Sequence, residues 1–259
     1  MRAIWSGSIG FGLVNIPVKL YSAVQDSSLD LDMLDSKTGK HIKFKRVNES
    51  TGKEVPWDQI VKAYNYNDHY VVLEDEDFEA ASPKKSKMIE IESFIESKDI
   101  DEAYFETPYF IEPGEGGEKA YALLLNALKK SGKAGLSRFV LRTAEHLAVI
   151  RPKDNYLMLQ QLRFEEELRS PEDLRLPGDI KVSFKEIEVA MELIEQYSEP
   201  FEMDQYKDEY KKELLKIIKA KAGGKKVTVK KLDIEPTRKD DLFEQLRASL
   251  SRPAKKRAS

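Results

Sequence analysis

Short stretches of β-forming residues, separated by turn residues, recur along most of the chain and constrain its fold more than any other feature. The first is an extended stretch at Ala3–Tyr21, in which Pro17 disfavours a helix. The others lie at Lys40–Val47, Tyr70–Leu73, Met88–Ile95, Tyr104–Ile111, Leu136–Thr143, His146–Arg151 and Tyr156–Phe164. Many strands with few helices between them predict an antiparallel barrel or sandwich rather than a doubly wound sheet. The expected fold class is therefore mixed α/β, mainly β.

Three glycines lie within six residues of the first stretch, in GSIGFGLVNIPV (residues 7–18). A dinucleotide-binding loop needs a third glycine that opens a helix, but Asn15 stands there and Pro17 follows. A P-loop needs Gly-Lys followed by Ser or Thr, whereas His41, Glu54 and Ala134 follow the three Gly-Lys pairs. The stretch is therefore expected to be a strand, with room for a bulge.

Helices are expected in three places. Glu118–Lys130 carries one apolar stripe and ends near Gly132, and Ser183–Glu186 has the spacing of a capping box that opens a second helix. A third follows Pro200, with Asp204 as candidate cap and Gly223 at its end. These patterns predict a core at residues 1–182, a small helical region at 183–222 and a tail at 223–259, with a short amphipathic patch at 241–250.

No recognisable catalytic constellation emerges from the sequence. The chain has no cysteine, which excludes disulfides, thiol nucleophiles and cysteine-ligated zinc. Lys231-Leu-Asp-Ile234 lacks the final glycine of the K-x-D-G motif of DNA ligases. The acidic run at 74–77 suits a helix N-terminus better than a metal site, and the three histidines are far apart. We expect no enzyme activity, no metal and no cofactor.

Charge is distributed unevenly along the chain. The formal net charge is −3, but residues 223–259 carry 11 Lys and Arg against 5 Asp and Glu, or +6, which leaves 32 against 41, or −9, on residues 1–222. A basic terminal block either binds nucleic acid or is merely solvated. No apolar run approaches the roughly 20 residues of a membrane helix, and no signal peptide is evident, so a soluble, cytoplasmic protein is expected.

Basic side chains recur on the predicted strands. Arg138 and Arg142 should share one face, about 13 Å apart at roughly 3.3 Å per residue, a pitch that can follow the phosphates of a DNA strand. Lys43 and Lys45 alternate with Ile42 and Phe44, as on a half-buried strand. Because one face of any antiparallel sheet is wet and charged, spacing alone leaves an ordinary solvated face as the alternative.

The opening residues MRAIWSGSIGFGLVNIPVKLYSA resemble those of bacterial Ku, the DNA-end-binding protein of non-homologous end joining. Further blocks are similar to the same family in the same order, and the similarity covers residues 1 to about 222. They are Ile42–Arg46, Tyr70–Asp77, Ile100–Phe105, Lys119–Leu123 and Leu147–Arg151, with Asp241–Leu250 resembling the extended C-terminal segment.

This resemblance implies a β-barrel core that forms half of a DNA-encircling ring, a homodimer, and a helical C-terminal region that recruits the ATP-dependent ligase D. It implies a bacterial, nucleoid-associated protein without catalysis of its own. The candidate DNA contacts are Lys43, Lys45, Arg46, Arg138, Arg142, Arg151 and Lys153, with tail contacts at Lys225, Lys226, Lys230, Lys231, Lys255, Lys256 and Arg257. Tyr206, Tyr210 and Leu214 either dock the ligase or pack within the helical region.

One departure from the family concerns zinc. Many members carry C-x-x-C where this chain has Asn48 and Thr51, so this copy should not bind zinc there, although Thr51-Gly52 favours a turn. The rival expectation for function is a general DNA-coating or architectural protein that needs no free end.

Overall fold

A computed structural model describes residues 1–81, 87–142, 144–178, 180–225 and 242–251. The chain divides into two compact units, one formed by Met1–Ser27 with Leu31–Pro171 and one formed by Ser28–Asp30 with the described residues from Glu172 onward. The boundary expected from the sequence was at residue 182, whereas the first unit ends at Pro171. Among the described residues, no helix is long and apolar enough to cross a membrane.

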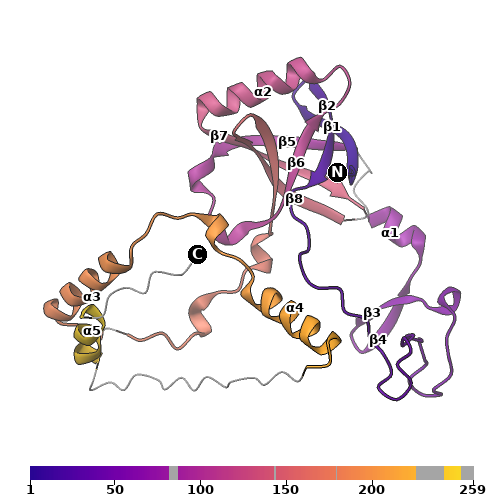
Figure 1. Cartoon of the computed structure of the whole chain (residues 1–259). Helices are drawn as coiled ribbons and strands as arrows, with labels where there is room; N and C mark the ends of the chain where they lie inside the picture. The colour runs from indigo at the N-terminus through magenta and orange to yellow at the C-terminus, as the bar shows by residue number, and fades with distance from the viewer. Residues whose placement is uncertain (82–86, 143, 179, 226–241, 252–259) are drawn as a thin grey trace. The chain divides into compact units, whose positions relative to one another are not determined.

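The first unit is built on a closed barrel, in the strand order β1-β2-β6-β9-β8-β7-β5 (Figure 1). The strands are β1 (Trp5–Phe11), β2 (Val14–Ser22), β5 (Met88–Glu96), β6 (Phe105–Pro113), β7 (Lys133–Leu141), β8 (Ala144–Lys153) and β9 (Tyr156–Leu162). Neighbours pair antiparallel except β1 and β5, which close the barrel as a parallel pair. The predicted mainly β fold and antiparallel barrel are confirmed.

The barrel encloses the hydrophobic core, and one helix adds to it. Buried side chains come from every strand of the barrel, among them Ile9, Leu20, Ile89, Ile111, Phe139, Ile150 and Leu159. Helix α2 (Glu118–Ser131) buries Tyr121, Leu124, Leu125 and Leu128, the predicted stripe. The Tyr121 hydroxyl donates to the carbonyl of Ile111 and accepts from the amide of Leu157, which fixes α2 to β6 and β9. Gly132 ends the helix in the left-handed conformation, as predicted.

The first predicted strand is in fact two. Residues 5–22 form the hairpin of β1 and β2, which reverses at Gly12, where φ is +56°. Gly7 is required for a different reason, because a Cβ there would lie 2.1 Å from the carbonyl oxygen of Lys87. A Cβ on Gly10 would lie 2.7 Å from the Met88 sulfur. The glycines therefore allow β5 to approach β1 and the chain to turn, in line with the expected close backbone approach.

Residues 31–81, which we call the β2–β5 connection, contain no buried residue. Their regular elements are the hairpin of β3 (Lys62–Tyr66) and β4 (His69–Leu73), a short 3₁₀-helix at Trp57–Gln59 and α1 (Asp75–Ala81). The half-buried strand expected at Lys40–Val47 was wrong. That segment has single bridges at its ends, Leu34 with His41 and Val47 with Glu54, and Phe44 is 80% exposed.

Other predicted bounds shift by a few residues. Strand β7 begins three residues before the expected Leu136 and ends at Leu141, because α2 turns directly into it through Gly132. The acidic run opens α1 as expected, with Asp75, Glu76 and Asp77 in its first turn. Further 3₁₀ turns lie at Ser97–Asp99, Glu102–Tyr104, Glu165–Glu167, Pro171–Asp173 and Met203–Gln205.

The second unit is helical. It contains α3 (Phe184–Tyr197), α4 (Glu209–Ala222) and α5 (Leu242–Leu250), and α5 packs against α3. Ser183 caps α3 in the predicted capping box, in which its hydroxyl accepts from the Glu186 amide. The prediction that Asp204 caps α4 was wrong, because Asp204 lies in a separate 3₁₀ turn. Asp208 caps the helix instead.

Candidate nucleic-acid interface

The seven basic residues proposed from the barrel and its connection fall into three groups. Lys43, Lys45 and Arg46 lie in the β2–β5 connection, Arg138 and Arg142 near the β7–β8 turn, and Arg151 and Lys153 at the opposite end of that hairpin. By strand register Arg138 lies opposite Leu147, four residues before Arg151, which is about 14 Å along the strand at roughly 3.4 Å per residue. Arg142 lies farther away, beyond the end of β7.

The connection presents its cations at the surface. Lys45 Nζ lies 2.5 Å from a Glu54 carboxylate oxygen, and the Arg46 guanidinium lies 4.1 Å from the centroid of the Trp57 ring. Lys43 is exposed and forms no ion pair with a described residue. Between the two lysines Phe44 projects an exposed ring. This segment offers cations and apolar surface side by side.

Arg138 is occupied by carboxylates. Its guanidinium lies 3.1 Å from Glu145 and 2.8 Å from Glu92. The hydrogen bond to Glu145, followed by the charge of Glu92, raises the pKa of Arg138 above its ordinary value. Two carboxylates against one guanidinium leave this part of the sheet without positive charge, so it is a weak attractor of phosphate.

Arg142 does not share a strand face with Arg138. It lies beyond the end of β7, in the turn, with φ +62°, so the predicted 13 Å spacing on one face was wrong. The alternation of side chains across a strand stops where the strand ends.

Arg151 and Lys153 line a hollow of about 540 Å³ together with two lysines that were not predicted, Lys129 and Lys133. The Arg151 guanidinium lies 4.8 Å from the Phe105 ring centroid and donates to the Gln160 side-chain oxygen at 3.3 Å. One carboxylate, Asp154, also lines the hollow, and Lys133 lies 3.8 Å from Glu96 outside it. We call this hollow, with its four cationic side chains, the basic hollow.

Local folding explains the basic hollow. Lys129 lies in the last turn of α2, and Gly132 reverses the chain so that Lys133 opens β7 beside it. Arg151 and Lys153 end β8, next to the turn at Asp154. Cations near a helix C-terminus are favoured by its exposed carbonyls. The sequence signal for the two missed lysines was present in KKSGK, since the helix end at Gly132 had been recognised.

The expected ligase-binding residues are accessible in the helical unit. Tyr206 is 56% exposed and stacks on Phe201 at 6.3 Å, Tyr210 is 77% exposed on α4, and Leu214 is half-buried.

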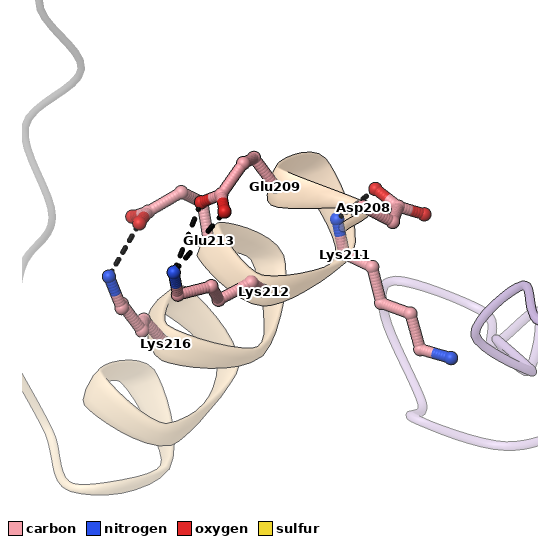
Figure 2. A network of polar contacts seen from close by, with 6 residues as sticks. All are labelled: Asp208, Glu209, Lys211, Lys212, Glu213 and Lys216. Atoms are coloured by element: carbon pink, nitrogen blue, oxygen red, sulfur yellow. Dashed lines mark hydrogen bonds and ion pairs between the residues drawn. The ribbon is translucent and has the colours of Figure 1, made fainter. Parts of the chain in front are cut away.

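Ion pairs between neighbouring turns form a polar network on α4 (Figure 2). Lys212 Nζ lies 3.2 Å from a Glu209 carboxylate oxygen, and Lys216 Nζ lies 2.5 Å from a Glu213 carboxylate oxygen. The hydrogen bond from Lys216 lowers the pKa of Glu213 and the hydrogen bond to Glu213 raises the pKa of Lys216.

Of the tail residues expected to contact DNA, one lies among the described residues. Lys225 is exposed just after α4, whereas Lys226, Lys230, Lys231, Lys255, Lys256 and Arg257 lie outside the described residues.

The turn at Asn48 and Thr51 is closed by hydrogen bonds. The Asn48 side-chain oxygen accepts from the amides of Ser50 and Thr51 at 3.0 Å and from the Thr51 hydroxyl at 3.2 Å, and Gly52 follows with φ +65°. The same arrangement recurs at Asp35, which accepts from the amide of Lys37 and the hydroxyl of Thr38. In the described part of the chain, no group of three or more potential metal ligands comes together.

Comparison with known proteins agrees with this architecture. A family model described as the Ku70/Ku80 β-barrel domain matches residues 10–191. A protein of Archaeoglobus fulgidus named non-homologous end joining protein Ku is 39% identical over 252 residues, covering 96% of this chain and 98% of the relative. Proteins of the same name in Coxiella burnetii (38% identity, 98% of this chain and 96% of the relative) and Bacillus subtilis (37%, 97% and 82%) are also similar. With a matching barrel model over most of its length and relatives this similar over nearly all of it, the chain belongs to the Ku family.

Proposed function

We propose that the protein acts in non-homologous end joining as a homodimer that encircles double-stranded DNA ends without sequence preference. In this proposal it catalyses no reaction, needs no cofactor, and recruits and stimulates an ATP-dependent DNA ligase D. Membership of the Ku family carries the proposal, because the similar proteins bear the name of the end-joining pathway. The fold itself does not specify a function, so the interfaces must supply further support.

The β2–β5 connection supports the homodimer. It exposes many large apolar side chains, including Leu31, Met33, Phe44, Trp57, Val61, Tyr64, Tyr66, Tyr70 and Val72. An isolated two-stranded hairpin such as β3–β4 is marginally stable in water, and an extended apolar surface usually marks an interface. A second copy of the chain would cover this surface and complete a ring.

The basic groups suggest how DNA is held. Lys43 and Arg46 in the connection and the basic hollow on the barrel offer point charges and guanidinium groups suited to phosphates. Contacts to phosphates position a duplex without reading its sequence, which suits a protein that must bind any broken end. The net charge of −9 on residues 1–222 is compatible with this role, because DNA responds to the local field.

Arg138 and Arg142 are weaker candidates for the same surface. Glu92 and Glu145 already neutralise Arg138, and Arg142 lies at the far end of the β7–β8 hairpin from the basic hollow. We assign the main barrel contribution to Arg151 and Lys153, with Lys129 and Lys133.

The helical region from residue 183 to 222 is the proposed ligase-recruiting unit. Exposed Tyr206 and Tyr210 would provide aromatic anchors of the kind that dominate interfaces. Leu214 lies about one turn after Tyr210 on α4. The tail lysines would add sequence-independent affinity for DNA.

A direct test compares binding to a linear blunt duplex with binding to a covalently closed circle of the same sequence, at matched salt. Preference for the linear form, lost when bulky adducts block both ends, is the expected result. Equal binding to both forms would refute encirclement and favour a DNA-coating protein.

A further inference from the structure

A second hollow lies at the β7–β8 turn, at the end of that hairpin away from the basic hollow. It has a volume of about 670 Å³. Its lining comes from the N-terminal segment, from β2, β6, β7, β8 and β9, and from the β7–β8 turn. It consists of Arg2, Ala3, Ile4, Ser22, Thr107, Tyr109, Leu141, Arg142, His146 and Gln161. We call it the barrel-end pocket. The Trp5 indole donates to the carbonyl of Val140 at 3.1 Å, which ties the N-terminal segment to the end of β7.

The pocket has a one-sided charge. Two arginines line it and no aspartate or glutamate does. Neither Arg2 nor Arg142 forms an ion pair with a carboxylate among the described residues, unlike Arg138 nearby in the sequence. Two uncompensated guanidinium groups at one cavity attract an anion.

The backbone of Arg142 is unusual. Outside glycine, the described residues with positive φ are Asn67, Asp68, Asp154 and Arg142. Asparagine and aspartate tolerate this conformation, whereas a long side chain such as arginine is uncommon there and costs on the order of 1 kcal/mol. A glycine or asparagine would close the same turn with less strain. The strain indicates that the side chain of Arg142 is needed at this position.

The pocket wall also holds a neutral donor in place. Gln161 is 91% buried, and its amide nitrogen lies 2.7 Å from a Glu106 carboxylate oxygen and 3.0 Å from His146 Nδ1. An amide nitrogen can only donate, so both its hydrogens are used and His146 Nδ1 accepts. The neutral imidazole therefore carries its proton on Nε2, for which no described residue provides an acceptor.

Tyr109 keeps the wall uncharged. Burial raises the pKa of its hydroxyl and the charge of Glu106 adds to this rise, whereas the hydrogen bond with Thr107 and the charge of Arg142 act in the opposite direction. The hydroxyl therefore stays protonated near neutral pH and donates to the Gln161 side-chain oxygen at 3.5 Å.

We propose that the barrel-end pocket binds a phosphate monoester. Such a group carries close to two negative charges and three acceptor oxygens. Two guanidinium groups can each offer paired N–H donors, and His146 Nε2–H adds a neutral donor. The cavity is large enough for the sugar that bears the phosphate. The monoester comes either from a small sugar phosphate or from the 5′ terminus of a DNA strand.

The test is calorimetric titration of the full chain with ribose 5-phosphate, with ribose as the ligand control. Ribose 5-phosphate should bind and ribose should not. Arg142→Gly should weaken binding at least about tenfold, since a hydrogen bond to a charged group is lost. Because glycine relieves the left-handed backbone, this variant should melt at the same temperature as the parent or higher. Lys119→Gln, on the exposed side of α2, should bind like the parent.

Absence of binding to ribose 5-phosphate, or equal affinity in Arg142→Gly, would overturn the proposal. Because this titration contains no DNA, its result does not depend on the proposed role in end joining. Competition with duplexes that differ in the 5′ group then identifies the source. Displacement by a 5′-phosphorylated duplex alone supports the DNA terminus, and displacement by neither supports a small ligand. Equal displacement by the 5′-phosphorylated and 5′-hydroxyl duplexes would mean that backbone diesters occupy the pocket, and would refute a monoester site.

Discussion

The barrel and the β2–β5 connection use the same kinds of residue with opposite outcomes. In the barrel, alternating side chains give each strand one face that is fully covered, as for Ile9, Leu20 and Ile150. In the connection, similar alternation leaves Tyr64, Tyr66 and Val71 exposed. The closed barrel buries its own inner face, whereas no described residue of the same unit buries the β3–β4 hairpin.

The difference teaches that an apolar pattern specifies a face to be buried but not what buries it. Burying a large apolar side chain is worth roughly 1.5–3 kcal/mol, so a surface of this size left in water is a substantial unmet driving force. The barrel should therefore behave as a self-sufficient fold and the connection as half of an interface. The following expectations test that contrast, from the largest effect to the smallest.

Truncation inside the barrel should have the largest effect. Leu159 is fully buried on β9, and Leu159→Ala should lower the free energy of unfolding by about 2–5 kcal/mol through lost burial and the cavity left behind. Urea unfolding measures this change. Leu123→Ala is the matched control, because Leu123 is 69% exposed on α2 and its loss should cost little. Similar costs for both variants would contradict a barrel with a single packed core.

Closure of the barrel depends on Gly7. In Gly7→Ala the new Cβ would meet the Lys87 carbonyl oxygen, so β1 and β5 would have to separate, at an expected cost of roughly 1–3 kcal/mol. Thermal unfolding would detect it. Alanine at Gly178, where a Cβ meets nothing within 4 Å, is the control. If the two variants melt together, the parallel pair does not hold the barrel closed.

Much of the barrel could be predicted because its signals are local. Helix α2, its buried stripe and its glycine cap, and the capping box at Ser183 follow from spacing and end chemistry alone. The β1–β2 hairpin was missed because Gly12 alone signals the turn, within a continuous apolar run. Sequence spacing cannot distinguish a bulge from a reversal there.

The candidate site was only partly predictable, because it depends on pairing across strands. The two carboxylates that neutralise Arg138 come from β5 and from β8, and strand register brings them together. The pairing of β7 with β8 likewise brings Lys133 to Arg151, and the turn at Gly132 places Lys129 of α2 beside them, across 18 or more residues of sequence. Periodicity places a residue on a face but does not name its neighbours.

Dimerisation should depend on the connection and not on the barrel. Tyr64 and Val71 are cross-strand neighbours, both exposed, and replacing both with serine should weaken self-association at least about tenfold by removing apolar surface from the interface. Sedimentation over a range of concentrations measures this change. The melting transition of the barrel should stay in place at concentrations where the parent is monomeric. Unaltered association would remove this face from the interface.

The barrel and the β2–β5 connection should also differ in how much their lysines contribute to DNA binding. Neutralising Lys129 and Lys153 should weaken binding to all DNA sequences alike and reduce the dependence of log affinity on log salt by roughly two. Neutralising Lys43 and Lys45 should reduce it less, because Glu54 already pairs with Lys45. Lys19→Gln with Lys119→Gln serves as the control of equal charge. A salt dependence that the first pair leaves unchanged would exclude the basic hollow from DNA contact.

The smallest effect is expected at the Asn48 turn. In Asn48→Ala three hydrogen bonds to the side-chain oxygen are lost, which should destabilise the turn by about 1 kcal/mol and speed amide exchange at Ser50 and Thr51. Hydrogen exchange resolved by residue measures this, with Asn126→Ala on α2 as the control. Because no residue of the connection is buried, the barrel amides should keep their protection. Loss of protection in β8 or β9 would mean that the turn and the barrel unfold as one unit, and the contrast between the two regions would fail.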